Sequence, residues 1–232
     1  MKTGTSARWI CALAALAVTV TATSAQASVI TWTFANGTTP TADPTTITTS
    51  EVTGGTMSLV NPHTSAAMLD NSSASSGYTG ASGTYNAAAS FNATTGVTAT
   101  STGYTFTLTP AANTTLTFTG LNLGQRSTGS GPVALWLYSD QSPSPAASIT
   151  VNNDSTWHMY QFAPFSLSIS GPTTFTLYGT DGSSAASTPN GRIDDMTLTY
   201  TASVAAPEPA SLAMLGLGGA ALLARRRRKP AR

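Results

Sequence analysis

The residues that could carry acid–base, nucleophilic or metal chemistry are few in this sequence and lie far apart. Of the 232 residues, 8% are charged, whereas an average globular domain has roughly 25%. His63 and His158 are the two histidines, and Cys11 is the one cysteine. No Gly-x-Ser-x-Gly segment occurs in 28–206, so a hydrolase with a nucleophile elbow is not indicated. Two isolated histidines do not supply the ligands of a zinc site.

Carboxylates are the remaining candidates for catalysis. Asp194 and Asp195 are adjacent, and neighbours on a strand point to opposite faces, so they do not form the facing pair of a glycoside hydrolase. Asp140, Asp154 and Asp181 fall near predicted turns, where aspartate commonly bonds to nearby backbone. Calcium binding by loop aspartates stays open as an alternative, although no EF-hand spacing occurs. We therefore expect no enzyme activity, cofactor or metal, with a cryptic hydrolase as an alternative.

Arg126, Arg192 and Asp194 are the most informative charged residues, because the two arginines are the only basic residues in 28–206. Strict alternation along the last predicted strand puts Arg192 and Asp194 on the same face as the apolar residues of 196–200. Charges on a core face must be paired. We predict a structural clasp in which one or both arginines bind the aspartates of this strand. A sugar-binding role for the same residues is the alternative.

The segment 28–206 has the patterns of strands and few of helices. Segments 104–109 and 115–119 alternate apolar residues with threonine, and 173–178 and 196–200 do the same. Further strands are predicted at 30–34, 133–138 and 167–169, of which 133–138 is apolar on both faces and is expected to be a central strand. Threonine, present 42 times, is an uncharged β-former suited to the solvent face. The pattern predicts an all-β fold, an antiparallel β-sandwich or jelly roll.

Two further features concern ligand binding and nucleic acid. Trp136, Trp157 and several tyrosines have the chemistry of a sugar-stacking platform, although aromatic residues in a β-sandwich more often belong to the core.

The segment 28–206 has eight acidic and two basic residues, a formal net charge of −6. Such a body cannot neutralise a phosphate backbone, so a nucleic-acid partner is disfavoured.

The N-terminus has the pattern of a secretory signal peptide. A positively charged start is followed by an apolar run and by Ala25-Gln26-Ala27, a small-x-small cleavage sequence. We place cleavage between Ala27 and Ser28. A membrane anchor is the alternative, but the apolar run is short for a span of roughly 20 residues. Cleavage removes Cys11, so the mature protein would contain no disulfide.

The C-terminus has three parts in a fixed order. Pro207-Glu208-Pro209 precedes an uncharged apolar run, 210–224. A basic block follows: Arg225, Arg226, Arg227, Arg228 and Lys229. A helix over the apolar run would be about 22 Å long, short of a hydrocarbon core of roughly 30 Å, and snorkelling arginines and bilayer thinning would close the gap. The positive-inside bias keeps the basic block cytoplasmic.

This tail resembles the PEP-CTERM sorting signal of Gram-negative bacteria over about 26 residues. The matching residues are Pro207, Glu208, Pro209, Gly216, Gly218, Gly219 and the terminal arginines. The resemblance implies that an exosortase, an integral-membrane transpeptidase-like enzyme, recognises the tail and removes it near the Pro-Glu-Pro motif. It also implies that the body passes to the cell surface or the extracellular polysaccharide. A simple C-terminal membrane anchor is the alternative.

The segment 104–200 also looks like the β-sandwich module common in PEP-CTERM surface proteins. The matching pieces are 121–123, 126–132, 175–179 and 191–196. Asp195 stands where that group usually has asparagine. This second resemblance implies an architecture and a location, and it implies no reaction.

Together these features predict three parts. They are a signal-peptide helix, 1–27, a β-sandwich body, 28–206, and a sorting tail with a short transmembrane helix, 207–232. We expect an exported, non-enzymatic structural or adhesive protein, transiently anchored in the inner membrane and finally at the cell surface or in the exopolysaccharide matrix. The alternative is a carbohydrate-binding module with a specific glycan ligand.

Overall fold

A computed structural model describes residues 26–34, 46–47, 50–64, 69–70, 74–81, 85–205 and 218. Between residues 26 and 205, every regular element described is a β-strand. The predicted signal-peptide helix and nearly all of the sorting tail lie outside the described residues. Within the described part of the chain, no helix is long and apolar enough to cross a membrane.

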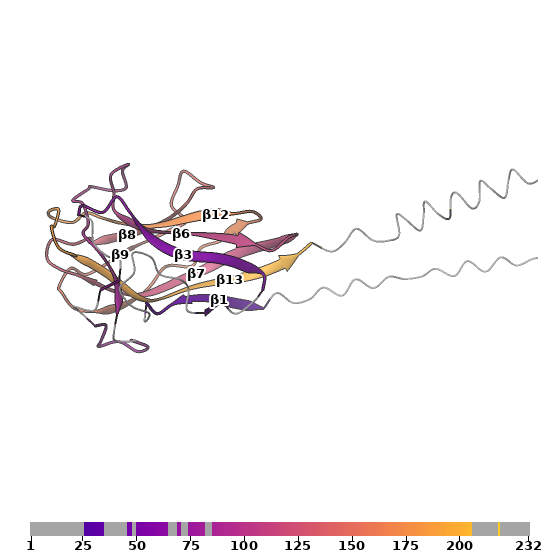
Figure 1. The fold of residues 1–232 in the computed structure, drawn as a ribbon, viewed down its shortest axis with the longest axis horizontal. Helices are drawn as coiled ribbons and strands as arrows, with labels where there is room; N and C mark the ends of the chain where they lie inside the picture. The colour runs from indigo at the N-terminus through magenta and orange to yellow at the C-terminus, as the bar shows by residue number, and fades with distance from the viewer. Residues whose placement is uncertain are drawn as a thin grey trace, which may run out of the picture.

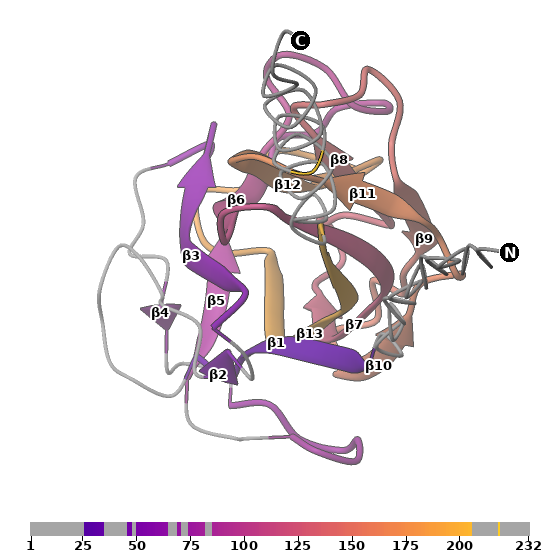
Figure 2. The same ribbon diagram turned by 90° about the vertical axis from the view of Figure 1, so that its right-hand side faces the viewer.

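The strands form two antiparallel sheets that pack as a β-sandwich (Figures 1 and 2). We call the larger one sheet A. It contains β1 (Ala27–Trp32), β2 (Thr46–Ile47), β4 (Leu69–Asp70), β5 (Asn86–Ala89), β7 (Thr114–Ser127), β10 (His158–Gln161), β11 (Leu167–Ile169) and β13 (Gly191–Val204). Its main order is β10-β7-β13-β1-β2; β11 also pairs with β7, β5 with β13, and β4 with β5. The all-β sandwich predicted from alternation is therefore confirmed.

Sheet B has five strands. They are β3 (Val52–Val60), β6 (Gly103–Pro110), β8 (Ala134–Ser139), β9 (Ala147–Thr150) and β12 (Thr173–Thr180), in the order β3-β6-β12-β8-β9. The predicted strand 133–138 corresponds to β8, which lies between β12 and β9. Its position inside the sheet confirms the prediction of a central strand. Its residues alternate between buried and half-buried, so one of its two apolar faces is more exposed than the other.

Alternate residues of both sheets fill the space between them, because side chains on a strand point to opposite faces in turn. Trp32 of sheet A packs on Phe106 of sheet B with ring centroids 4.9 Å apart. Phe118 of sheet A meets Phe175 of sheet B edge to face at 5.1 Å. Burying each such side chain contributes about 1.5–3 kcal/mol, so these aromatic contacts hold the two layers together. The threonines that alternate with these apolar residues along each strand face outward.

The first and last strands bring the two ends of the body to one pole of the sandwich. In the β1–β13 ladder, Ala27 lies opposite Thr201. β13 ends at Val204, and the N–H of Ala205 donates to the carbonyl of Asn113 at 2.8 Å. The beginning of β1 and the end of β13 therefore lie side by side (Figure 1).

Candidate functional site

A β-bulge in β13 decides where the charged residues lie. The register against β7 shifts between Asp194 and Thr197, and Asp195 there has a φ of 48°. One extra residue reverses the phase of alternation. Ile193 consequently belongs to the core, whereas Arg192 and Asp194 lie on the outer face of sheet A. The prediction that both lie on the face of Met196 is wrong for this reason.

The outer face of sheet A is covered at this point by the segment 74–81, which we call the strap. The Tyr78 hydroxyl donates to Asp195 Oδ2 at 2.6 Å, and its ring packs on Trp157 with centroids 6.4 Å apart. Tyr78 occupies the space over Gly124, where a Cβ would lie 2.2 Å from the tyrosine oxygen. Burial and the hydrogen bond to Asp195 raise the pKa of Tyr78 well above its ordinary value.

The covered face buries a group of polar side chains. Arg192 is 6% exposed and Asp194 is 0% exposed. Nη1 of Arg192 donates to Asn86 Oδ1 at 3.0 Å. Arg126 lies opposite Arg192 in the β7–β13 ladder, and its Nε donates to the carbonyl of Ser155 at 2.7 Å. Partial burial, followed by the nearby charge of Arg192, lowers the pKa of Arg126. The clasp between these arginines and Asp194 stays a prediction.

The two histidines lie in different surroundings. His158 Nε2 lies 2.9 Å from Asp154 Oδ2, and hydrogen bonds from the Thr156 N–H and from His158 lower the pKa of the Asp154 carboxyl. His63 Nδ1 lies 3.0 Å from Asn92 Oδ1. Neither of these contacts involves a serine hydroxyl. Among the described residues, no group of three or more histidine, cysteine, aspartate or glutamate side chains could hold a metal ion.

The aromatic residues lie in the core, under the strap on sheet A and on the outer face of sheet B. Trp157 is 6% exposed and lies against the strap. Trp136 is half-buried on the outer side of β8, and its Nε1 donates to Thr180 Oγ1 at 3.0 Å. Tyr138 and Tyr178 meet edge to face beside it, with centroids 5.9 Å apart. The available aromatic strip therefore consists of Trp136, Tyr138 and Tyr178, and Trp157 is not part of it.

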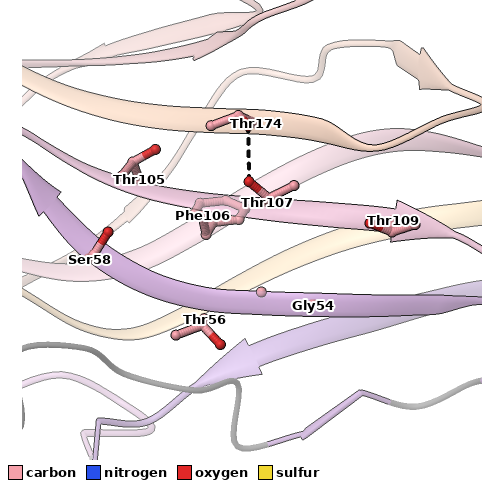
Figure 3. Close-up of a pocket in the computed structure, with 9 residues that line it drawn as sticks. Gly54, Thr56, Ser58, Thr105, Phe106, Thr107, Thr109 and Thr174 are labelled. Atoms are coloured by element: carbon pink, nitrogen blue, oxygen red, sulfur yellow. Dashed lines mark hydrogen bonds between the residues drawn. The ribbon is translucent and has the colours of Figure 1, made fainter.

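A hollow on the outer face of sheet B, which we call the threonine groove, crosses β3, β6 and β12 (Figure 3). Its volume is about 430 Å³. Its lining consists of Gly54, Gly55, Thr56, Ser58, Thr105, Phe106, Thr107, Thr109 and Thr174. The hydroxyls of Thr107 and Thr174, on the neighbouring strands β6 and β12, lie 2.9 Å apart and face each other.

The threonine groove depends on a glycine pair in β3. Gly54 and Gly55 have φ angles of 92° and 90°, which side chains other than glycine rarely adopt, and the register against β6 shifts here. A Cβ on Gly54 would lie 2.4 Å from the Thr107 carbonyl oxygen. The Gly55 carbonyl accepts a hydrogen bond from Trp32 Nε1 at 2.8 Å. A buried tryptophan of the core therefore holds the bulge in position. Both glycines line the hollow, so the bulge shapes one side of the threonine groove.

A second hollow, the tyrosine groove, continues across β12 and β8. It has a volume of about 290 Å³ and is lined by Val97, Tyr138, Ser139, Asp140, Thr174, Thr176 and Tyr178. Thr174 lines both grooves, so the two hollows meet at β12. Asp140 is the one charged residue among the residues that line them.

The sequence predicted outward threonines on these strands but not the grooves. Alternation fixes which face a threonine occupies, and the register between distant strands decides which threonines become neighbours. The one local signal was Gly54-Gly55 inside an otherwise extended segment, because glycine within a strand often marks a bulge.

The tail of the chain is assigned by comparison with known families. Residues 205–229 match the family model of the PEP-CTERM protein-sorting motif. The chain carries a PEP-CTERM sorting motif. The PEP-CTERM match begins at Ala205, directly after the last residue of β13, and spans the Pro-Glu-Pro sequence, the apolar run and the basic block. It agrees with the resemblance drawn from the tail's three parts.

Comparisons of the whole chain are less informative. The search of curated proteins found no significant match. Among solved structures, the C-terminal CBM6 of LamC, a marine laminarinase from Zobellia galactanivorans, aligns with a TM-score of 0.31 and 11% identity, covering 62% of this chain and 98% of that one. The CBM35 from Paenibacillus barcinonensis aligns with a TM-score of 0.27 and 18% identity, covering 64% and 93%.

Proposed function

We propose that the protein is an exosortase substrate whose body, 28–206, is delivered to the cell surface or the exopolysaccharide matrix. The signal peptide, 1–27, directs export and is removed before Ser28. The tail, 207–232, then holds the protein in the inner membrane with its basic block in the cytoplasm, until an exosortase cuts near Pro207-Glu208-Pro209. The PEP-CTERM match at 205–229 carries this proposal.

The geometry of the last strand supports processing close to the folded body. Ala205 is hydrogen-bonded to the carbonyl of Asn113, and two residues of chain reach at most about 7 Å. Pro207 therefore starts within that distance of the pole where β1 begins and β13 ends. Because both ends leave from this pole, membrane attachment at either end leaves the opposite pole and the outer face of sheet B available.

We further propose that the delivered body acts as a structural or adhesive protein and not as an enzyme. Arg192, the most buried of the charged side chains whose burial the structure describes apart from Asp194, bonds to Asn86 within the body. Tyr78 and Asp195 bond to each other. The first of these bonds links β13 to β5, and the second holds the strap on sheet A.

Mass spectrometry of protein extracted from the cell surface tests the sorting proposal. We expect a mature species that starts at Ser28 and ends near Pro207. A matched variant with Pro207, Glu208 and Pro209 replaced by alanine should retain the tail and stay in the membrane fraction. Peptides spanning Arg225 to Lys229 in the surface fraction of the unaltered protein would contradict the proposal.

A carbohydrate-binding module is the second candidate. The hydroxyl-lined and tyrosine-lined grooves on the outer face of sheet B support it, because ligand sites combine apolar surface with a few well-placed polar groups. A glycan array probed with the surface-extracted protein distinguishes the two: selective binding to one glycan favours a module with a specific ligand, and uniform weak binding favours a structural role.

A further inference from the structure

The outer face of sheet B presents hydroxyls in a row that crosses the strands. Ser58, Thr105, Thr176 and Tyr138 lie opposite one another in the ladders of β3, β6, β12 and β8. Neighbouring strands are about 4.8 Å apart, so the row extends over about 14 Å. Thr176 Oγ1 donates to Thr105 Oγ1 at 3.2 Å, and Thr105 Oγ1 donates to the carbonyl of Phe175 at 3.0 Å. These bonds therefore orient the hydroxyls of Thr105 and Thr176 before any ligand arrives.

The aromatic strip stands at the β8 end of this row. Tyr178 lies opposite Trp136 on one side and opposite Gly103 on the other. A Cβ on Gly103 would lie 3.1 Å from Tyr178 Cδ1, so the absence of a side chain there gives the tyrosine ring room toward β6. Trp136 is fixed through its hydrogen bond to Thr180. The strip thus offers aromatic surface next to the hydroxyl row.

The charge distribution selects the class of ligand. Arg126 and Arg192, the only basic residues of the body, lie on the outer face of the other sheet. The residues that line the two grooves include no cation and one carboxylate, Asp140. An anionic polymer would therefore meet a surface without a counter-charge on a body of net negative charge. A neutral polyhydroxylated chain has the hydroxyl donors, acceptors and C–H faces that this lining can contact.

We infer that the threonine and tyrosine grooves together form one binding site for a neutral linear polysaccharide, which lies across β3, β6, β12 and β8. The hydroxyls of Thr107 and Thr174 bind its polar edges at the centre, and Tyr138 and Tyr178 pack on a sugar ring at one end. The two grooves meet at Thr174, because this residue lines both of them. This inference rests on the carbohydrate-binding alternative of the proposed function.

The test measures retention of the surface-extracted protein by affinity electrophoresis in gels containing one of four polysaccharides. The probes are a β-1,3-glucan, hydroxyethyl cellulose, an α-1,4-glucan and alginate. We expect retention by at least one neutral glucan, unchanged when the salt concentration is raised, because exposed charge interactions weaken with salt and this contact has none. Retention by alginate alone, or by no probe, would overturn the inference.

Three variants locate the site. Tyr178→Ala removes an aromatic anchor and should weaken binding at least about tenfold. Thr174→Val keeps the shape and removes one hydroxyl, with an expected loss of about threefold to tenfold. Thr107→Glu places bulk and charge in the threonine groove and should abolish retention. Because Thr107 is exposed, this third variant keeps the test valid if Tyr178→Ala fails to fold.

Matched variants on sheet A provide the controls. Thr117 and Ser168 form the equivalent exposed hydroxyl pair there, 2.8 Å apart. Thr117→Val, Thr117→Glu and Met159→Ala should leave retention within about twofold of the unaltered protein. Equal losses on both sheets, or none on sheet B, would overturn the inference. The sorting proposal is judged separately by mass spectrometry, so either can fail while the other stands.

Discussion

The outer faces of the two sheets differ in what they do with their polar residues. On sheet A, Arg192 and Asp194 are buried, and Tyr78 of the strap fills the space over Gly124. On sheet B, the threonines and tyrosines stay in contact with solvent and line two grooves. The difference teaches that the buried charges of sheet A, Arg192 and Asp194, are enclosed within the body, whereas uncharged hydroxyls and aromatic rings form most of the lining of the grooves on sheet B.

The comparison predicts that equal-sized changes have unequal effects on the two faces. A polar group buried under the strap has lost its water and depends on its protein partners, whereas an exposed threonine can exchange a protein partner for water. Substitutions on sheet A should therefore lower the free energy of unfolding, and those on sheet B should alter binding.

The largest effect is expected for Arg192→Met. The change keeps most of the volume but removes a buried charge, and it leaves Asn86 Oδ1 without the donor at 3.0 Å. In the predicted clasp it also leaves the buried Asp194 carboxylate without its counter-charge. Breaking a buried ion pair in this way costs about 3–5 kcal/mol, a large share of the roughly 5–15 kcal/mol of a typical domain. Chemical denaturation measures the loss.

Two further variants sharpen this prediction. Arg192→Met combined with Asp194→Leu should recover part of the loss if the two charges form the predicted clasp. Arg126→Met should cost less, about 1 kcal/mol, because Arg126 is only half-buried. A loss under about 0.5 kcal/mol for Arg192→Met would mark a solvated surface charge and would favour a ligand role for this arginine.

The next effect concerns Gly124→Ala. The new methyl group would lie 2.2 Å from the Tyr78 oxygen and 2.4 Å from Cζ, so the Tyr78 ring must move away from its bond to Asp195, at a cost of about 1–3 kcal/mol. Gly120→Ala, on the same strand, meets its nearest atom at 3.8 Å and should change stability by less than about 0.5 kcal/mol. Thermal denaturation compares the two, and equal melting temperatures would contradict the packing of Tyr78 on Gly124.

A smaller effect is expected for Tyr78→Phe. At pH 7 the variant loses the hydrogen bond to Asp195, worth about 1 kcal/mol. Burial raises the pKa of both Tyr78 and Tyr104 in the folded state. The two neutral tyrosines contribute fully to the free energy of unfolding below the ordinary tyrosine pKa of about 10. This contribution decreases at higher pH, because the unfolded chain then releases protons that the folded chain keeps.

Unfolding curves between pH 7 and pH 11 test both parts of this prediction. The fully buried Tyr104 lowers the free energy of unfolding by up to about 1.4 kcal/mol per pH unit above pH 10, and the half-exposed Tyr78 adds less. The difference between Tyr78→Phe and the unaltered protein should therefore narrow above pH 10. A difference that grows with pH would contradict the burial of Tyr78.

The smallest effect on stability is expected for Thr107→Ala on sheet B. Its hydroxyl bonds to Thr174 at the surface, and water replaces that partner, so the free energy of unfolding should change by less than about 0.5 kcal/mol. Denaturation under the conditions used for Arg192→Met checks this. A loss above about 2 kcal/mol would mean that sheet B's outer polar groups stabilise the fold as those of sheet A do.

Some features of this structure could be predicted because they depend on residues that are close together in the sequence. Period-two alternation in 104–109 and 173–178 indicated β6 and β12, since a strand's inward and outward sides follow from its own sequence. The sorting motif was likewise predictable, because its order of Pro-Glu-Pro, apolar run and basic block is read along the chain. The face of Arg192 was not, because one bulged residue, Asp195, reversed the phase.

The sequence by itself determined the fold class, the sorting motif and the scarcity of charge. Tertiary structure alone decided that the strap covers sheet A and that sheet B stays open. It also brought Gly54, Thr107 and Thr174 together from three strands to form a groove. The physical reason is the distance along the chain between the residues involved. Alternation and composition are properties of residues close together in the sequence, whereas strand register and covering loops depend on contacts between residues far apart in the chain.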